Sequence, residues 1–260
     1  MKKNILSGAF IKQRSGMDKW NLPVWDMHCH ILPGVDDGAK NMTDALKMLE
    51  LEMKEGINKI LLTPHYLAGK TDPDLIKTQY QKLKYEIKIR NYPLELYLGN
   101  ELFYSTSIIF ELQKGRALTL AGTSYVLIEF ETEISYQKMR KALNELLMAG
   151  YRPIIAHMER FTCLMSNKNR ITELIRQGVL MQANTNSFIW HRTSNSLLQL
   201  LQHGNIHFIG TDCHRPDWRT PQMQITIKKI QTKLQTEEMI RIFVENPNQL
   251  LKNQYIRRKK

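Results

Sequence analysis

Short apolar runs alternate with amphipathic stretches along most of this chain. Seven runs share the length and aliphatic character of strands that are buried in a parallel sheet. They are PVWDMHCH (residues 23–30), KILLTPH (59–65), ELYLGNE (95–101), YVLIEFE (125–131), PIIAHMER (153–160), VLMQANTN (179–186) and HFIGTDCH (207–214). The sequence therefore predicts seven strands.

The segments between these runs carry helical patterns. Apolar residues recur at helical spacing over residues 42–53 and 139–147, and a glycine follows each stretch at the point where a left-handed residue ends a helix. Asp72 and Pro73 supply an N-cap and a first-turn proline for a helix that reaches about residue 90.

Strands and helices that alternate in this way predict βα units and a parallel sheet. We expect a single α/β domain folded as a distorted, TIM-like (β/α)7 barrel. A doubly wound open sheet is the competing arrangement, but it usually carries a glycine-rich phosphate turn after its first strand. The corresponding stretch here, HILPGVDDG, is not such a turn.

Charge is concentrated at the two ends of the chain. The 260 residues are 42% hydrophobic with a formal net charge of +12, and KKNILSGAFIKQR and YIRRKK carry much of the excess. We expect residues 1–24 to be a flexible extension, 25–250 to be the barrel domain and 251–260 to be a basic tail. A basic surface suits nucleic acid, an anionic membrane or a phosphorylated substrate, and charge by itself does not choose among them.

The apolar stretches reach about five residues, far below the roughly 20 that span a bilayer. Membrane insertion and a signal peptide are therefore not expected. Cys29, Cys163 and Cys213 make no even disulfide framework, which fits a cytoplasmic enzyme.

Six of the seven runs end in histidine or acidic residues. The carboxyl ends of parallel barrel strands lie on one face, so residues far apart in sequence converge there. The converging set is His28, His30, His65, Glu101, Glu129, His157, Asp212 and His214. All are metal-ligand types, and a structural role would require six independent coincidences at strand ends.

The spacing of these residues favours a metal site. His28 and His30 are two apart on a strand and point the same way, and Asp212 and His214 repeat this geometry. Mixed nitrogen and oxygen donors suit Zn, Mn or Fe better than Ca or Mg. One acid of the pair at residues 36 and 37 brings the set to nine, enough for two or three ions of the kind used in phosphoester hydrolysis.

The motifs DMHCH, TPH, GNE, IEF, AHMER and TDCH resemble those of the polymerase and histidinol phosphatase (PHP) superfamily. Within it, HILPGVDDGAK, LIEF and IAHMERF most resemble the manganese-dependent bacterial tyrosine phosphatases of the CpsB/YwqE type, encoded beside capsule and exopolysaccharide genes. The match runs from about Trp25 to Pro247. It implies a protein-tyrosine phosphatase that acts on a bacterial tyrosine kinase.

The resemblance also implies a three-metal site, with Mn²⁺ as the expected ion and Fe or Zn as alternatives. His28, His30, Glu101 and Asp212 would hold the first ion. Glu101 would bridge to a second ion, shared with Glu129 and His157, and Asp37, His65 and His214 would hold the third. Arg160 and Arg219 look like the family's phosphate clamps, and a planar guanidinium suits phosphate. Asp212 is counted with them as catalytic.

The sequence is also compatible with other functions. A small-molecule phosphatase of the histidinol phosphatase kind would use almost the same site. A nucleic-acid enzyme is disfavoured because no basic stretch is interleaved with aromatic residues. An amidohydrolase normally uses a bridging lysine where this chain has Glu129. CHRPDWR, residues 213–219, matches the C-x5-R pattern of cysteine phosphatases, but it contains Pro216 and lacks the glycines of a phosphate loop. The oligomeric state is not encoded in these motifs.

Overall fold

The hydrophobic runs form parallel strands in a computed structural model that describes residues 23–256. The strands are β1 (Val24–Cys29), β2 (Ile57–Leu62), β3 (His65–Tyr66), β4 (Glu95–Leu98), β5 (Glu101–Phe103), β6 (Tyr125–Glu129), β7 (Arg152–Ile155), β8 (Leu180–Asn184) and β9 (Phe208–Gly210). The predicted second and third strands are each broken in two, as β2/β3 and β4/β5. Pro64 lies in the first break and cannot donate to a ladder.

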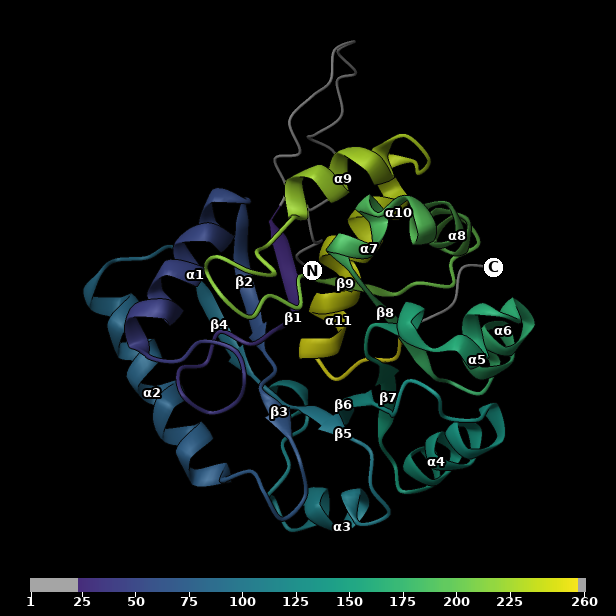
Figure 1. Cartoon of the computed structure of the whole chain (residues 1–260), viewed down its shortest axis with the longest axis horizontal. Helices are drawn as coiled ribbons and strands as arrows, with labels where there is room; N and C mark the ends of the chain where they lie inside the picture. The colour runs from purple at the N-terminus through teal and green to yellow at the C-terminus, as the bar shows by residue number, and fades with distance from the viewer. Residues whose placement is uncertain (1–22, 257–260) are drawn as a thin grey trace, which may run out of the picture.

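The strands follow one another around a ring (Figure 1). One sheet has the order β1-β2-β4 and the other has the order β3-β5-β6-β7-β8-β9. At these breaks, backbone hydrogen bonds from Gly99 N to Leu62 O and from Glu101 N to Pro64 O join the second predicted strand to the third. The end of β1 meets the segment that follows β9 at a parallel bridge between Cys29 and Cys213. The predicted distorted, TIM-like (β/α)7 fold is confirmed.

The described part of the chain has eleven α-helices, and most of them lie around the outside of this ring (Figure 1). They are α1 (Met42–Lys54), α2 (Pro73–Ile89), α3 (Ile108–Gln113), α4 (Tyr136–Met148), α5 (Thr162–Met165), α6 (Lys168–Arg176), α7 (Thr185–Ile189), α8 (His191–Gln202), α9 (Met223–Gln231), α10 (Thr236–Ile240) and α11 (Asn246–Leu251). Short helical turns are η1 (Leu120–Gly122), η2 (Met158–Arg160) and the π-helical η3 (Arg241–Glu245). The two helices predicted from spacing correspond to α1 and α4, and the helix predicted from Asp72 and Pro73 corresponds to α2.

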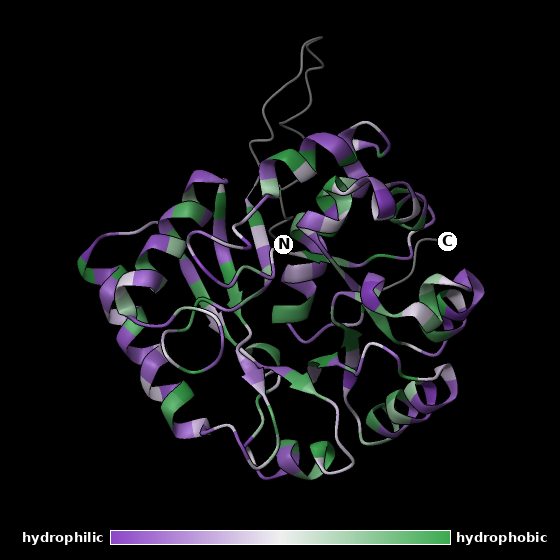
Figure 2. Cartoon of the chain, in the orientation of Figure 1, coloured by the Kyte–Doolittle hydropathy of each residue, from purple (hydrophilic) through white to green (hydrophobic). Residues whose placement is uncertain are grey.

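The helix ends follow the predicted local chemistry. The Asp72 side chain accepts hydrogen bonds from the backbone N–H groups of Asp74 and Leu75, so it caps α2. The outer helices are banded with hydrophobic and hydrophilic residues (Figure 2). Their apolar residues belong to the large core between helices and strands, which is why one face of each helix is buried.

A second apolar cluster includes residues of β1, β6 and α11. It contains Trp25, Met27, Leu127 and Leu250, all buried. In Figure 1, α11 lies at the centre of the ring of strands. These bulky side chains form an apolar cluster that is separate from the polar residues at the carboxyl ends of the strands.

Parts of the predicted extension and tail lie outside the described residues, namely 1–22 and 257–260. β1 begins at Val24, the last residue of the predicted extension, and α11 ends at Leu251, the first residue of the predicted tail. Beyond α11, Arg152 donates to the backbone carbonyl of Asn253. Among residues 23–256, every helix is too short or too polar to cross a membrane.

Candidate metal centre

Four buried side chains from three strand ends converge on one point. Glu101 Oε2 lies 3.1 Å from His28 Nε2 and 3.2 Å from His30 Nε2. Asp212 Oδ1 lies 3.7 Å and 3.4 Å from the same two nitrogens. All four residues are at most 2% exposed. The tertiary structure therefore brings together two imidazole nitrogens and two carboxylates that are up to 184 positions apart in sequence.

Glu101 faces a second group with its other oxygen. Its Oε1 lies 2.7 Å from Nε2 of His157, and the same nitrogen lies 3.2 Å from Glu129 Oε1. Glu101 Oε2 also lies 3.0 Å from His65 Nδ1. One carboxylate thus contacts histidines on both of its sides, which is the placement that a bridging ligand requires.

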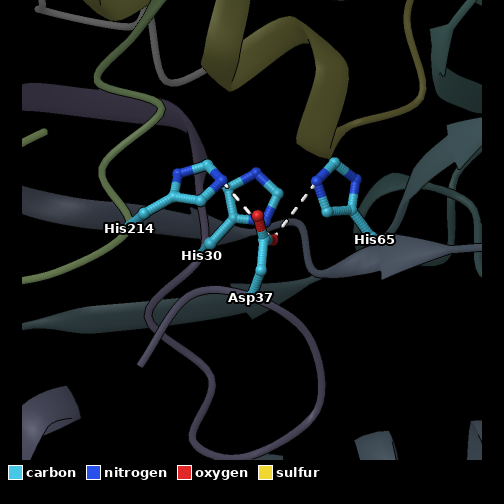
Figure 3. A group of neighbouring side chains, drawn as sticks. All are labelled: His30, Asp37, His65 and His214. Carbon is cyan, nitrogen blue, oxygen red and sulfur yellow. Dashed lines mark ion pairs between the residues drawn. The ribbon is translucent and has the colours of Figure 1, made fainter. Parts of the chain in front are cut away.

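A third group is built around the loop that follows β1 (Figure 3). Asp37 Oδ1 lies 3.5 Å from His65 Nε2 and 3.6 Å from His214 Nε2. One ligand atom from each of these three residues and from His30 lies within 4.8 Å of the others. His30 therefore adjoins this group as well as the first one, a position that sequence reasoning did not foresee.

The two adjacent acids of this loop have different surroundings. Asp36 is largely buried, and its Oδ2 lies 2.8 Å from His30 Nδ1 and accepts from the backbone N–H of His65. The side chain of Asp37 is 64% exposed and faces the histidines. The structure thus places one acid behind a histidine and the other beside the cluster.

Two arginines form ion pairs with Asp212. Arg160 Nη2 donates to Asp212 Oδ2 over 2.5 Å, and Arg219 Nη2 contacts the same oxygen. Arg219 Nη1 also lies 3.2 Å from His214 Nε2. The Arg160 side chain is 41% exposed and that of Arg219 is 23% exposed, so both guanidinium groups border solvent beside the cluster. That position is open to an anionic ligand.

Sequence reasoning missed Gln182 and Asn184 as parts of this site. Gln182 Oε1 accepts from the backbone N–H of His157 over 2.6 Å and lies 3.1 Å from His28 Nδ1. Asn184 Nδ2 donates to Asp212 Oδ2 over 2.7 Å. The sequence did contain a signal for them. Two polar residues that are two positions apart in a buried apolar run share one face of the strand and therefore point toward the same site.

Two positions at the site require glycine because neighbouring atoms leave no room for a side chain. A Cβ at Gly38 would lie 2.0 Å from the carbonyl oxygen of His30, and a Cβ at Gly210 would lie 2.5 Å from the Cβ of His28. Asp212 itself has a φ of 51°, in the left-handed region that side chains rarely adopt. Close packing against the backbone of His28 and His30, and an unusual backbone conformation at Asp212, thus help to position these ligand-type residues.

The charges of the cluster stabilise one another. Burial would raise the pKa of Asp212, but His28, His30 and Arg160 hold it well below its usual range. Glu101 follows the same pattern: burial raises its pKa, but the imidazoles of His28 and His157 lower it by more, so the pKa lies well below its usual value. Both carboxylates are therefore ionised at neutral pH, which is the form that binds metal ions.

Cys213 is turned away from this cluster. It is fully buried, and its Sγ donates to Glu52 Oε1 of α1 over 3.2 Å. Asp212 and His214, on either side of it, face the metal-ligand cluster. The C-x5-R pattern of residues 213–219 therefore does not form a phosphate loop around a thiol.

A (β/α)7 barrel with clustered histidines and carboxylates at the carboxyl ends of its strands defines a class of metal-dependent hydrolases. Residues 24–252 match the family described as "Capsular polysaccharide synthesis, CpsB/CapC". The chain belongs to the CpsB/CapC family, as the motifs at the strand ends predicted.

Characterised relatives agree with this assignment. Tyrosine-protein phosphatase CpsB of Streptococcus agalactiae is 31% identical over 241 residues, which is 89% of this chain and 99% of the relative. Tyrosine-protein phosphatase YwqE of Bacillus subtilis is 29% identical and covers 89% of this chain and 92% of its own length.

Solved structures show the same fold. A crystal structure from a study of YwqE of Bacillus subtilis and CpsB of Streptococcus pneumoniae, described as unique metal-dependent tyrosine phosphatases, superposes with a TM-score of 0.83 at 28% identity. It covers 90% of this chain and 97% of its own. Histidinol phosphate phosphatase of Lactococcus lactis, at 17% identity and a TM-score of 0.54, shares the fold alone.

Proposed function

We propose that this chain is a metal-dependent protein-tyrosine phosphatase that works with Mn²⁺. The observation that carries the proposal is the convergence of six strand ends on one cluster of histidines and carboxylates, bordered by two arginines. Membership of the CpsB/CapC family, whose named relatives are tyrosine-protein phosphatases, supports the same reading.

The donor set fits metal ions. Glu101 Oε2 is buried without a conventional hydrogen-bond donor, and three imidazole nitrogens surround it at 3.0–3.2 Å. We assign the first ion to His28, His30, Glu101 and Asp212, the second to Glu101, Glu129 and His157, and the third to Asp37, His65 and His214. Mixed nitrogen and oxygen donors suit Mn²⁺, with Fe or Zn as alternatives.

Bound ions in such a site lower the pKa of a water molecule and offset the charge of phosphoryl oxygens. The chain's own part is to orient the ester. Arg160 and Arg219 supply planar guanidinium groups that bind phosphoryl oxygens and stabilise the negative charge of the transition state. Asp212 holds both guanidinium groups in position. A tyrosine leaves as a phenolate with a pKa near 10, so a strong general acid is not essential.

The substrate that we propose is a phosphotyrosine protein, in particular a bacterial tyrosine kinase of capsule or exopolysaccharide synthesis. The family description, which refers to capsular polysaccharide synthesis, supports this partner. A cytoplasmic location follows from a kinase substrate of this kind.

The test is metal analysis of the purified protein alongside turnover of a phosphotyrosine peptide and of histidinol phosphate. We expect Mn²⁺ to restore peptide turnover after chelation, and Asp212→Ala to abolish it. Asp74→Ala, on the exposed face of α2, is the control and retains activity. Preference for histidinol phosphate would overturn the assignment of substrate, and full activity of the Asp212 variant would overturn the assignment of the site.

A further inference from the structure

The loop between β9 and α9 places an exposed tryptophan beside the metal centre. Trp218 lies between Asp217 and Arg219 in a short turn and is 57% exposed. Its ring lies 6.4 Å from the ring of His214 at an interplanar angle of 82°. A large apolar side chain is thus left in solvent within ring-contact distance of a residue of the third ligand group.

The backbone of this turn is closed by two hydrogen bonds. His214 N donates to Arg219 O over 3.3 Å, and Arg215 N donates to Trp218 O over 3.2 Å. The same segment is joined to β1, because His30 N donates to Cys213 O over 2.9 Å. The position of Trp218 is therefore tied to the strands that carry the histidines.

Two guanidinium groups flank the indole. The Cζ atoms of Arg219 and Arg215 lie 5.6 Å and 6.0 Å from the ring of Trp218, within the range of cation–π contact. Arg219 also contacts Asp212 and His214. One arginine thus links the indole to the position where a phosphoryl group would bind.

We infer that Trp218 is a specificity-determining residue, an aromatic wall that packs against the ring of an aryl phosphate bound at the metal centre. This inference rests on the proposed function and names the part of the site that recognises the leaving group. The ring of an aryl ester is two bonds from phosphorus, through the ester oxygen, so a phosphoryl group on Arg219 would bring the ring within reach of the indole, which lies 5.6 Å from the Cζ of Arg219. Aromatic rings pack favourably with centroids 4.5–7 Å apart, whereas an alkyl group gains less from the same surface.

The test compares an aryl probe with a probe that has no ring. Binding of benzylphosphonate and of inorganic phosphate to the metal-loaded protein is measured by calorimetry for the wild type, Trp218→Ala and Trp218→Phe. We expect Trp218→Ala to weaken benzylphosphonate about 10-fold and phosphate less than about 2-fold, with Trp218→Phe close to the wild type. Tyr85→Ala, at an aromatic residue on α2 that is 63% exposed, is the control and changes neither.

Turnover of a phosphotyrosine peptide gives a second readout. Because the ring packs against Trp218 in the ground state and in the transition state, KM rises about 10-fold in Trp218→Ala while kcat stays within about 2-fold. Equal loss of both binding probes, or no loss of either, would overturn the inference. A wild-type protein that binds benzylphosphonate through Trp218 but does not hydrolyse the peptide would instead contradict the proposed function.

Discussion

Asp36 Oδ2 lies 2.8 Å from Nδ1 of His30, the ring nitrogen on the side opposite the ligand cluster. A carboxylate in this position accepts the Nδ1–H and leaves the lone pair of Nε2 available to a metal ion. Asp36 also accepts from the backbone N–H groups of Gly38 and His65. The acid therefore orients two parts of the site without facing it.

Substitutions of the two adjacent acids, Asp36 and Asp37, should have different effects. We expect Asp37→Asn to remove a ligand, so the protein loses one ion per chain, measured by elemental analysis, and more than about 100-fold in kcat/KM. Asp36→Asn leaves the ligands in place but disturbs the orientation of His30, at a cost of about 10–100-fold in metal affinity. If Asp36→Asn lost the ion and Asp37→Asn kept it, the two roles would be reversed.

Gln182 connects two of the strands that hold ligands. Gln182→Leu leaves the buried N–H of His157 without its acceptor, which costs about 1–3 kcal/mol in the free energy of unfolding. It also removes the partner of His28 Nδ1, so metal affinity falls about 10–100-fold. Denaturant titration and metal titration measure the two effects. Gln177→Leu, at an exposed position after α6, is the control, and equal behaviour of the two variants would argue against an orienting role.

Helix α4 offers a matched pair for the apolar core. Leu146 is fully buried, whereas Met148 is 89% exposed on the same helix. Leu146→Ala removes buried methyl groups and leaves a cavity, so the free energy of unfolding falls by about 2–5 kcal/mol. Met148→Ala changes it by less than about 0.5 kcal/mol. Comparable losses in urea titrations of the two variants would contradict this packing.

Glu111 gives a pH-dependent contribution to stability. Hydrogen bonds from Arg116 and Tyr66 lower the pKa of Glu111 from 4.5 to about 2. Because the folded-state pKa is the lower one, the stabilisation is fully present above about pH 4.5 and is lost as the pH falls toward 2. The thermal midpoint of Glu111→Gln should therefore lie below that of the wild type at pH 7.

The gap between the two thermal midpoints should narrow on acidification. Both proteins are measured in chelator, so that metal release does not contribute to the difference. A gap that stayed constant between pH 7 and pH 3 would show that the ionised carboxylate is not the source of the stabilisation.

Much of the fold was predictable because the signals were local or periodic. The seven apolar runs, the N-cap at Asp72 and the helical spacing of α4 depend on neighbouring residues, and each was found where the pattern placed it. The breaks in the second and third strands were not predicted. They lie side by side, where Gly99 N donates to Leu62 O and Asn100 Nδ2 donates to Pro64 O, and this pairing is not visible in either segment alone.

The sequence by itself determined which residues gather at the site, because the carboxyl ends of parallel strands must share one face of a barrel. Only the tertiary structure separated Asp36 from Asp37, drew Gln182 into the site and set Trp218 beside His214. These placements depend on loop paths and on close contacts between strands far apart in the chain. A local pattern does not specify such contacts, because each depends on how a loop or strand lies against its neighbours in the fold, as when Gln182 of β8 contacts His28 of β1.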